Sequence, residues 1–409
     1  MRIRIFVMTS LMMTSSAYAL VGVDELAKSL YQKNQEIAAL EKVAESKESL
    51  RQSADSGFYP TLNVVGGWGK DDTAELAHVQ KGYFGYAEGK LNLFRGFKDQ
   101  SIQTLKELDV KISRLDVELK KRELRVHLIE VATDMIFLHK VQSILDEEYK
   151  TIKNQKLMAA KKIAAGLTGQ VDDLEFVLRE NEIEIEQKQI DQKHLEAHQR
   201  FIKLFGEDIS DADIEKITFS DFENLKQVAG AFKIEKSTSL LREQLLEERT
   251  RLEVREIKAD YLPTLDFTYN YGRITPSETS SAEFNESKIS LQLTVPLFSG
   301  LSTYYNSRAS TAVVDSVKKI KLQKNTDLQT EFESLKSKAA ELSFLYQINE
   351  KKLVNSQKYF DLTLIEYKRG IKNSPDLVNA TERLFLSKKK KFELLKDLEV
   401  TQVKIENLF

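Results

Sequence analysis

The sequence predicts a mostly α-helical chain with a small β part, built as two copies of one structural plan. Three observations support this prediction. Only five prolines and 16 glycines occur among 409 residues, which is too few for an all-β chain with many tight turns. Two very long stretches have helical hydrophobic spacing, and four short stretches alternate apolar and polar residues. Five motifs also recur in order at an offset of 203 or 204 residues.

The repeat is clearest beside the predicted strands. Residues 58–62 (FYPTL) recur as 261–265 (YLPTL), and residues 92–96 (NLFRG) recur as 296–300 (PLFSG). Each copy is expected to contain a helix (24–54 and 228–259), two strands, a long helix (97–165 and 301–369) and a last helix (172–205 and 375–409). At 1.5 Å per residue, each long helix would extend roughly 100 Å. We therefore divide the chain into a signal peptide (1–19), a first repeat (20–206), an inter-repeat segment (207–227) and a second repeat (228–409).

The N-terminus has the pattern of a secretion signal. Arg2 and Arg4 precede a mostly apolar stretch at 5–13, and residues 17–19 (AYA) form a small-x-small cleavage site. No other stretch approaches the roughly 20 apolar residues of a membrane-spanning helix. Lys and Arg (61) nearly balance Asp and Glu (63), so there is no basic stripe and no nucleic-acid partner is expected.

The long helices carry a coiled-coil seam, because apolar and small residues recur at strict 4-3 spacing. In the first copy the seam includes Leu105, Leu108, Ile112, Leu115, Leu119, Val126 and Ile129. In the second it comprises Leu328, Phe332, Leu335, Ala339, Leu342, Tyr346, Asn349, Leu353, Ser356, Phe360, Thr363 and Tyr367. Such a seam is equally compatible with an antiparallel coiled coil in a soluble protein.

The four short stretches are predicted to be strands with one apolar and one polar face. The clearest alternates Ile289, Leu291, Leu293 and Val295 with Lys288, Ser290, Gln292 and Thr294. The apolar sets of the others are Leu62, Val64 and Trp68; Ala87, Leu91 and Leu93; and Leu265, Phe267, Tyr269 and Tyr271. Polar loops are expected at 70–82 and 272–287. A soluble sheet with one wet face would alternate in the same way.

If these strands cross a bilayer, the apolar face meets lipid, and Lys90 and Asp266 lie on the water side. A four-stranded sheet cannot close a lumen, and an open strand edge is not tolerated in hydrocarbon. At least three copies would then have to share one barrel.

In these motifs the chain resembles the TolC family of outer-membrane efflux and type I secretion proteins. The resemblance rests on the paired aromatic-x-Pro-Thr-Leu strands, on 295–300 (VPLFSG) and on Gly370 followed by 376–381 (DLVNAT). It implies a homotrimer in the Gram-negative outer membrane, with a shared 12-stranded transmembrane β-barrel of four strands per chain and a periplasmic α-barrel of coiled-coil helices. It also implies three partners: outer-membrane lipid, a periplasmic adaptor (membrane fusion) protein, and an inner-membrane pump of the ABC or RND type.

The resemblance also places functional residues. Asp376 matches the aspartate of the family's periplasmic constriction, Asn379 stands where some members have a second aspartate, and Asp172 and Asp173 occupy the equivalent turn of the first copy. The tips expected to contact the adaptor are Gly166, Leu167, Thr168, Gly370 and Ile371, and the expected lipid-facing residues include Leu265, Phe267, Ile289, Leu291, Leu293 and Val295. Each has a structural alternative, since Ser374 could cap the last helix before Pro375, and both glycines could be left-handed helix ends.

Two function classes remain open, a passive export channel and a soluble exported coiled-coil scaffold or adaptor. An enzyme is not expected, because no metalloprotease, serine-hydrolase or nucleotide-binding signature occurs. His194 and His198 are four residues apart, but no third ligand is evident, so neither a metal nor a cofactor is expected. Drug efflux and type I secretion are not separable from the sequence.

Overall fold

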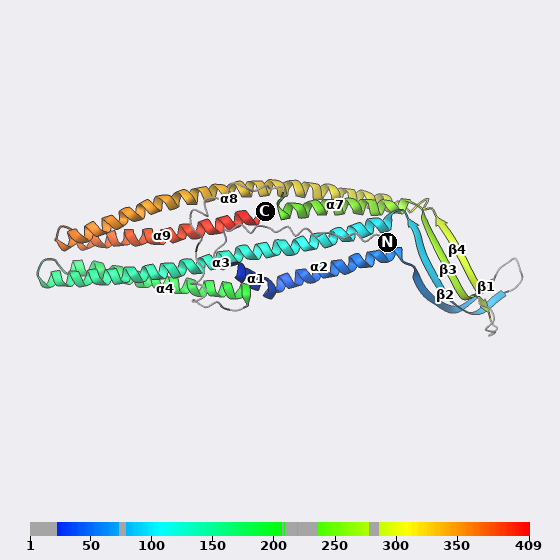
Figure 1. Cartoon of the computed structure of the whole chain (residues 1–409), viewed down its shortest axis with the longest axis horizontal. Helices are drawn as coiled ribbons and strands as arrows, with labels where there is room; N and C mark the ends of the chain where they lie inside the picture. Colours follow the sequence, from blue (N-terminus) through cyan, green and yellow to red (C-terminus); the bar gives the residue numbers. More distant parts are fainter. Residues whose placement is uncertain (1–22, 73–78, 207, 209–218, 220–235, 278–285) are drawn as a thin grey trace, which may run out of the picture. The chain divides into compact units, whose positions relative to one another are not determined.

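The structure is a computed structural model that describes residues 23–72, 79–206, 208, 219, 236–277 and 286–409 (Figure 1). The predicted signal peptide and nearly all of the inter-repeat segment lie outside these residues. The chain divides into two compact units, and each draws on both repeats. We call the described residues within 1–37, 120–234 and 328–409 the helical unit, and those within 38–119 and 235–327 the sheet unit.

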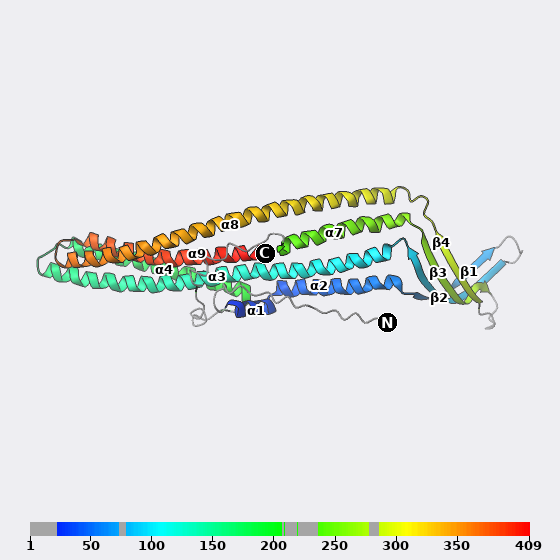
Figure 2. The same cartoon turned by 45° about the horizontal axis from the view of Figure 1, so that its top comes forward.

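The helical unit is built from two long helical hairpins. One consists of α3 (Lys98–Ala164), from residue 120 onward, and α4 (Val171–Phe205). The other consists of α8 (Ser302–Lys368), from residue 328 onward, and α9 (Ser374–Asn407); in both views each pair of helices runs side by side (Figures 1 and 2). The short α1 (Val23–Lys33) completes the unit. Within the described residues, none of the helices is both long and apolar enough to cross a membrane.

The predicted seams are confirmed. All twelve seam positions predicted in α8 are buried or half-buried, as are the seven predicted in α3. The polar seam residues of α8 find partners on α9, because Asn349 Nδ2 donates to the Ser387 carbonyl at 3.0 Å and the hydroxyls of Ser356 and Ser387 are 3.4 Å apart. Small polar residues can therefore occupy the seam without leaving unsatisfied groups.

The first predicted helix is interrupted. We expected one helix over 24–54, but α1 ends at Lys33 and α2 (Gln35–Ala54) begins after Asn34. Asn34 Oδ1 accepts hydrogen bonds from the backbone N–H groups of Glu36 and Ile37 at 3.0 and 3.1 Å. Asn34 therefore acts as the N-cap that starts α2, a role that asparagine fills well.

The sheet unit contains one antiparallel sheet in the order β1-β2-β3-β4. The strands are β1 (Thr61–Asp72), β2 (Val79–Arg95), β3 (Thr264–Ser277) and β4 (Glu286–Thr294). Most of α2, the first turns of α3 and α8, and α7 (Thr238–Lys258) belong to the same unit, and the short helices η1 (Asp55–Phe58) and η4 (Ala259–Tyr261) lead into β1 and β3.

The strands differ from the prediction in three ways. They run further than expected, so the loops predicted at 70–82 and 272–287 are partly strand. Val295 lies just beyond the end of β4. An irregularity between Asn92 and Phe94 places Phe94 opposite Leu265, so that Phe94 rather than Leu93 continues the pairing. A bulge of this kind adds one residue and shifts the alternation, which a strict period of two cannot anticipate.

Both strand-to-helix corners have the same unusual backbone. Gly96 and Phe97 have φ values of 60° and 63°, and Gly300 and Leu301 have φ values of 64° and 68°. Non-glycine residues rarely adopt this left-handed region. A Cβ at Gly96 would meet the Leu262 Cβ at 2.6 Å and the Ala259 carbonyl oxygen at 2.9 Å, whereas a Cβ at Gly300 would meet nothing within 4 Å.

We expect Gly96→Ala to destabilise the protein more than Gly300→Ala. Both substitutions place alanine in a left-handed conformation, which costs about 1–2 kcal/mol, but only the first also drives a methyl group into fixed atoms. The unfolding midpoints of the two variants in guanidinium, followed by circular dichroism at one protein concentration, test this. Equal midpoints would show that the tight contact at Gly96 is relieved without cost.

Candidate functional site

The two tips of the helical unit end in the same capping motif. Gly166 and Gly370 have φ values of 68° and 78°. In each tip the next residue donates its backbone N–H five residues back, Leu167 to Lys162 and Ile371 to Glu366, both at 2.9 Å. This is the Schellman arrangement, so the prediction that both glycines are left-handed helix ends is confirmed. The side chains of Leu167 and Ile371 are 74% and 67% exposed.

The start of α9 corrects one prediction. The N-cap is Asn373 rather than Ser374, because Asn373 Oδ1 accepts from the Asp376 backbone N–H at 3.1 Å. Ser374 is instead fully buried, and its hydroxyl donates to the Tyr367 phenol oxygen at 3.4 Å. Asp376 thus lies in the first turn of α9, where its negative charge interacts favourably with the positive end of the helix dipole. Its Oδ2 is 3.6 Å from Lys372 Nζ.

The remaining predicted constriction residues are partly accessible. Asn379 is exposed one turn beyond Asp376, and Arg383 follows on the same side of α9. In the first tip, Asp172 and Asp173 lie in the first turn of α4 and are half-buried. The Thr168 hydroxyl donates to Asp172 Oδ2 at 2.5 Å. One tip therefore presents an acid with an amide, and the other presents two acids.

The structure also joins the two tips through Tyr367, a contact that the sequence did not reveal. Lys162 Nζ, from α3, lies 3.8 Å from the centre of the Tyr367 ring and donates to the Tyr367 carbonyl. Phe176, from α4, packs edge-on against the same ring at 6.2 Å between centroids. Tyr367 and Phe176 are both fully buried and share a core cluster with Leu377. The side chain of Tyr367 therefore connects the tip between α8 and α9 to the tip between α3 and α4.

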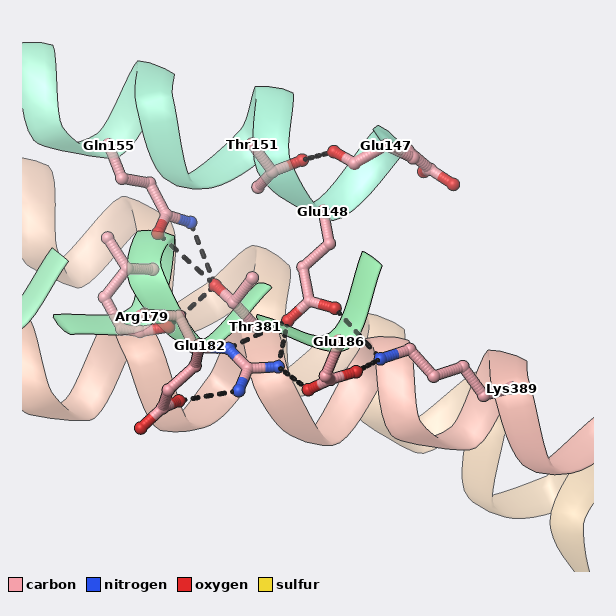
Figure 3. A network of polar contacts seen from close by, with 10 residues as sticks. Glu147, Glu148, Thr151, Gln155, Arg179, Glu182, Glu186, Thr381 and Lys389 are labelled. Atoms are coloured by element: carbon pink, nitrogen blue, oxygen red, sulfur yellow. Dashed lines mark hydrogen bonds and ion pairs between the residues drawn. The ribbon is translucent and has the colours of Figure 1, made fainter. Parts of the chain in front are cut away.

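Further from the tips, a buried charge network connects three helices (Figure 3). Glu148 of α3 is fully buried, and its Oε1 accepts from Arg179 Nε at 3.0 Å and from an Arg179 terminal nitrogen at 2.5 Å. Glu148 Oε2 has no hydrogen-bond partner, and Lys389 Nζ of α9 lies 3.5 Å from it. Lys389 also pairs with Glu186, and Arg179 with Glu182 at 2.8 Å, both on α4.

The sequence carries a signal for this network. Arg179 lies on the apolar face of α4, three residues after Phe176 and four before Ile183, which are both fully buried. A cation in that position requires a buried anion. Burial raises the pKa of the Glu148 carboxyl, although Arg179 and Lys389 act in the opposite direction. Burial lowers the pKa of Arg179, but its bonds to Glu182 and Glu148 outweigh this effect and raise it.

In the sheet unit, the strand register gathers the apolar residues on one face. Directly opposed residues of an antiparallel pair share a face. Leu265 opposes Leu293, Phe267 opposes both Leu291 and Leu91, and Tyr269 opposes Ile289. Ile289, Leu291 and Leu293 are 64–69% exposed, whereas Leu265 and Phe267 are half-exposed. A continuous apolar surface therefore faces outward from this chain.

The other face of the sheet is polar. Lys90 opposes Thr268, which opposes Ser290, and Asn92 opposes Asp266, which opposes Gln292. Lys90 Nζ lies 3.4 Å from Asp266 Oδ2, so the two charges expected on the water side pair with one another. The sheet thus has one face suited to hydrocarbon and one suited to water.

The histidine pair on α4 forms a contact but no metal site. The rings of His194 and His198 are 4.6 Å apart, and His198 Nδ1 lies 2.7 Å from Asp208 Oδ1. In the part of the chain that the structure describes, no group of three or more His, Asp or Glu side chains is placed to hold a metal ion.

The chain combines two long helical hairpins with a four-stranded sheet that exposes one apolar face. Comparisons with known proteins show which proteins share this fold. Residues 234–409 match the model of the family described as outer membrane efflux protein. Comparison with curated proteins gives no significant match.

Solved structures share the fold over nearly the whole chain. CusC is 10% identical with a TM-score of 0.80, covering 96% of this chain and 93% of that chain. VceC of Vibrio cholerae is 11% identical with a TM-score of 0.79, covering 95% and 96%. The open-state channel MtrE of Neisseria gonorrhoeae is 10% identical with a TM-score of 0.78, covering 96% and 89%. The chain thus has the fold of the TolC-like outer-membrane channels, and its second repeat matches the outer membrane efflux protein family.

The buried network should respond asymmetrically to substitution. In Glu148→Gln, Arg179 keeps Glu182 and Glu186, so no cation is left alone. In Arg179→Gln, Glu148 keeps only Lys389. We expect Arg179→Gln to cost about 3–5 kcal/mol of unfolding free energy, as for a buried charge that loses its partner, and Glu148→Gln to be at least as stable as the parent at neutral pH.

The pH dependence has a definite sign. Because the folded-state pKa of Glu148 lies above the model value of 4.5, the folded protein binds this proton more tightly and gains stability as the pH falls through that pKa. The advantage of Glu148→Gln should therefore shrink as the pH falls toward about 4.5. Glu182→Gln, which removes a 60% exposed carboxylate, is the control and should change stability by at most about 1 kcal/mol. A pH-independent difference between Glu148→Gln and the parent would contradict the assignment.

Proposed function

We propose that this protein is the outer-membrane exit duct of a tripartite export system and conducts substrates passively to the cell exterior. The fold shared with solved outer-membrane channels and the match of residues 234–409 to the outer membrane efflux protein family support the duct itself. The finer statements are that three copies assemble, that the helices lie in the periplasm, and that an adaptor and an inner-membrane pump deliver the substrate. This chain would then use no chemical energy of its own.

The observation that carries the proposal is the two-faced sheet with open edges. β1 and β4 form the two edges of the four-stranded sheet in this chain. In hydrocarbon each unpaired backbone group costs several kcal/mol, so strands can span a bilayer only in a closed barrel. Eight strands would leave an interior filled by side chains. Three copies would join β1 of one subunit to β4 of the next and close a 12-stranded barrel around water.

This arrangement assigns roles to both faces of the sheet. Leu265, Phe267, Ile289, Leu291 and Leu293 would face lipid, together with Val295 at the end of β4. Lys90, Asp266 and Gln292 would line the lumen. The strand register supports the first assignment, because it places these apolar residues on one face of the sheet. The ion pair between Lys90 and Asp266 supports the second, because it places two charges on the opposite face.

The tips would form the periplasmic end of the duct. Asp376 would line the constriction, with Asn379 as a neutral second ring and with Asp172 and Asp173 behind them in the first tip. Gly166, Leu167, Thr168, Gly370 and Ile371 would meet the adaptor. Exposed Leu167 and Ile371 support this role, because each places an apolar side chain in solvent at the outermost turn.

The direct test is fractionation of cells that produce the full chain. We expect the protein in the outer membrane, extracted only by detergent, and migrating as a trimer. A soluble monomer in the periplasm would instead support a coiled-coil scaffold. Gene deletion, followed by drug-sensitivity tests and comparison of the secreted proteins, would decide between drug efflux and type I secretion and so between RND-type and ABC-type pumps.

Adjacent residues of β4 provide a matched test of the lipid face. Leu291→Lys would place a charge in hydrocarbon at a cost of about 2–4 kcal/mol per subunit, whereas Gln292→Lys adds a cation beside Asp266 on the polar face. We expect Leu291→Lys to reduce the amount of heat-resistant trimer in the outer membrane, and Gln292→Lys to leave it near the parent level. Equal effects would mean that the two faces are not in different solvents.

The constriction can be tested by ion selectivity in planar bilayers under a salt gradient. Asn379→Asp would add three carboxylates to a trimer and should shift the reversal potential toward stronger cation preference, while Asp376→Asn should weaken it. Glu393→Gln, about 25 Å further along α9, is the control for a general change in charge. A reversal potential that follows net charge regardless of position would remove Asp376 and Asn379 from the constriction.

A further inference from the structure

α4 carries two heptad seams on opposite faces, and only one of them is covered in this chain. The covered seam contains Phe176, Ile183, Ala197 and Phe201. Two residues further along, about 200° around the helix, a second set follows strict 4-3 spacing, and all ten of its members are exposed: Val171, Leu174, Leu178, Asn181, Ile185, Lys188, Gln192, Leu195, Gln199 and Ile202. We call this set the outer α4 seam.

α8 has an equivalent uncovered face. Its predicted seam, which includes Leu342, Asn349 and Ser356, is covered by α9. Two residues further along, a second set again follows the 4-3 spacing and is exposed throughout: Phe344, Gln347, Lys351, Val354, Lys358, Asp361, Ile365 and Lys368. We call it the outer α8 seam. Its three apolar members, Phe344, Val354 and Ile365, are 63%, 54% and 46% exposed.

The two outer seams lie on different sides of the helical unit. α8 packs on α9 through its covered seam, and α9 in turn contacts α3, where Gln155 bonds Thr381 at 2.9 Å, and α4, where Lys389 pairs with Glu186. α4 packs on α3 through Arg179 and Glu148. Near the tips, Phe176 of α4 also contacts Tyr367 of α8. α4 and α8 each turn the outer seam away from the helices that cover the opposite face. Two different surfaces of one chain that fit each other generate head-to-tail contacts, which close into a ring when the rotation permits.

The levels of α4 and α8 along the helical unit can be compared within one chain. Glu186 lies level with Lys389, and Asn349 lies level with Ser387 on the antiparallel α8, so Glu186 lies level with residue 347. Because α4 and α8 run antiparallel, residues at the same height along the unit have nearly the same sum of residue numbers. For residues 186 and 347 this sum is 533. Near the tips, Phe176 contacts Tyr367, and their numbers sum to 543. A rotation about an axis parallel to the helices leaves these levels unchanged.

The apolar residues of the two outer seams match at these levels. Leu174 with Ile365, Ile185 with Val354, and Leu195 with Phe344 all have residue numbers that sum to 539, inside the interval found within the chain. All three apolar residues of the outer α8 seam thus meet apolar residues of the outer α4 seam in one register. A shift by one heptad would place Val354 opposite Gln192 or Leu178 and would leave Ile365 opposite Asn181 or a position before α4.

The charges beside the seams are complementary. Glu175, Glu182, Glu184, Asp191 and Glu196 flank the outer α4 seam. At the level of Glu182 to Asp191, the outer face of α8 carries Lys351, Lys352 and Lys358, which are exposed and form no ion pair with any described residue. Lys188 would meet Lys351, but Lys188 is already paired with Asp191 at 3.1 Å. Acids beside one seam and unpaired lysines beside the other favour this pairing over like-with-like contact.

We propose that the outer α4 seam of one subunit packs on the outer α8 seam of the next, antiparallel and in the register Leu174–Ile365, Ile185–Val354 and Leu195–Phe344. The occupant of both faces is therefore a second copy of this chain. This inference rests on the proposed trimer and specifies the surfaces that join its subunits in the helical unit.

Disulfide cross-linking tests the register directly, because the chain contains no cysteine. Two variants carry matched pairs, Ile185→Cys with Val354→Cys and Leu174→Cys with Ile365→Cys. A third carries the mismatched pair Leu178→Cys with Val354→Cys, displaced by one heptad or about 10 Å, which exceeds the reach of a disulfide. The full-length protein is purified in detergent without any adaptor, oxidised mildly, and analysed on non-reducing gels, with the single-cysteine variants confirming that each substitution preserves the trimer.

Both matched pairs should give a ladder of covalent dimers and trimers that reductant removes, at least fivefold more than the mismatched pair. Native mass spectrometry of the parent protein distinguishes a failure of the proposed register from a failure of the proposed trimer. A trimer in which neither matched pair cross-links, or in which the mismatched pair cross-links as well, overturns the register and leaves the exit duct standing. A parent protein that is monomeric overturns both. Cross-linking that requires an added adaptor would assign the outer seams to the adaptor and also overturn the proposal.

Discussion

The heptad spacing of the long helices is the constraint on which the rest of the structure depends. A helix of 67 residues such as α3 or α8 cannot bury its length in a compact core, so it must be covered by neighbours that run beside it. The 4-3 spacing keeps the same face toward the same neighbour over many turns. In α4 and α8 two such faces occur on opposite sides, and the chain itself covers only one of each. In the proposed assembly, packing within the chain and packing between subunits would follow the same heptad spacing.

The sheet follows a related rule with a different period. Its alternation of two, combined with the register from β1 to β4, separates an apolar face from a polar face. Both faces and both edges remain incomplete in a single chain, in the same way that the outer seams do. The network around the fully buried Glu148 differs, because Arg179 and Lys389 supply its counter-charges within the chain. It ties α3, α4 and α9 together with charges whose burial is expensive, so it contributes a specific arrangement more than stability.

Most of the architecture was predictable, since length, spacing and repetition are properties of long stretches that local detail cannot alter. The seams of α3 and α8, the four strands and the left-handed tips follow from the sequence. The break at Asn34, the cap at Asn373 and the bulge at Asn92 do not, because each depends on one side chain competing with a regular backbone pattern. The contacts of Tyr367 with Lys162 and Phe176 were hidden for another reason. They join segments some 200 residues apart, and the seam that places Tyr367 inside does not identify its partners.

The strand-to-helix corners have a mechanical consequence. At Gly96–Phe97 and Gly300–Leu301, two successive residues occupy a left-handed region with little rotational freedom. The backbone at such a corner is therefore stiff and allows little rotation between the strand and the helix. If α3 turns about its own axis, the torque passes into β2, which is hydrogen-bonded to β1 and β3. If α8 turns, the torque passes into β4, which is hydrogen-bonded to β3. The sheet resists, so the twist must be taken up as gradual bending along the helix that follows the corner.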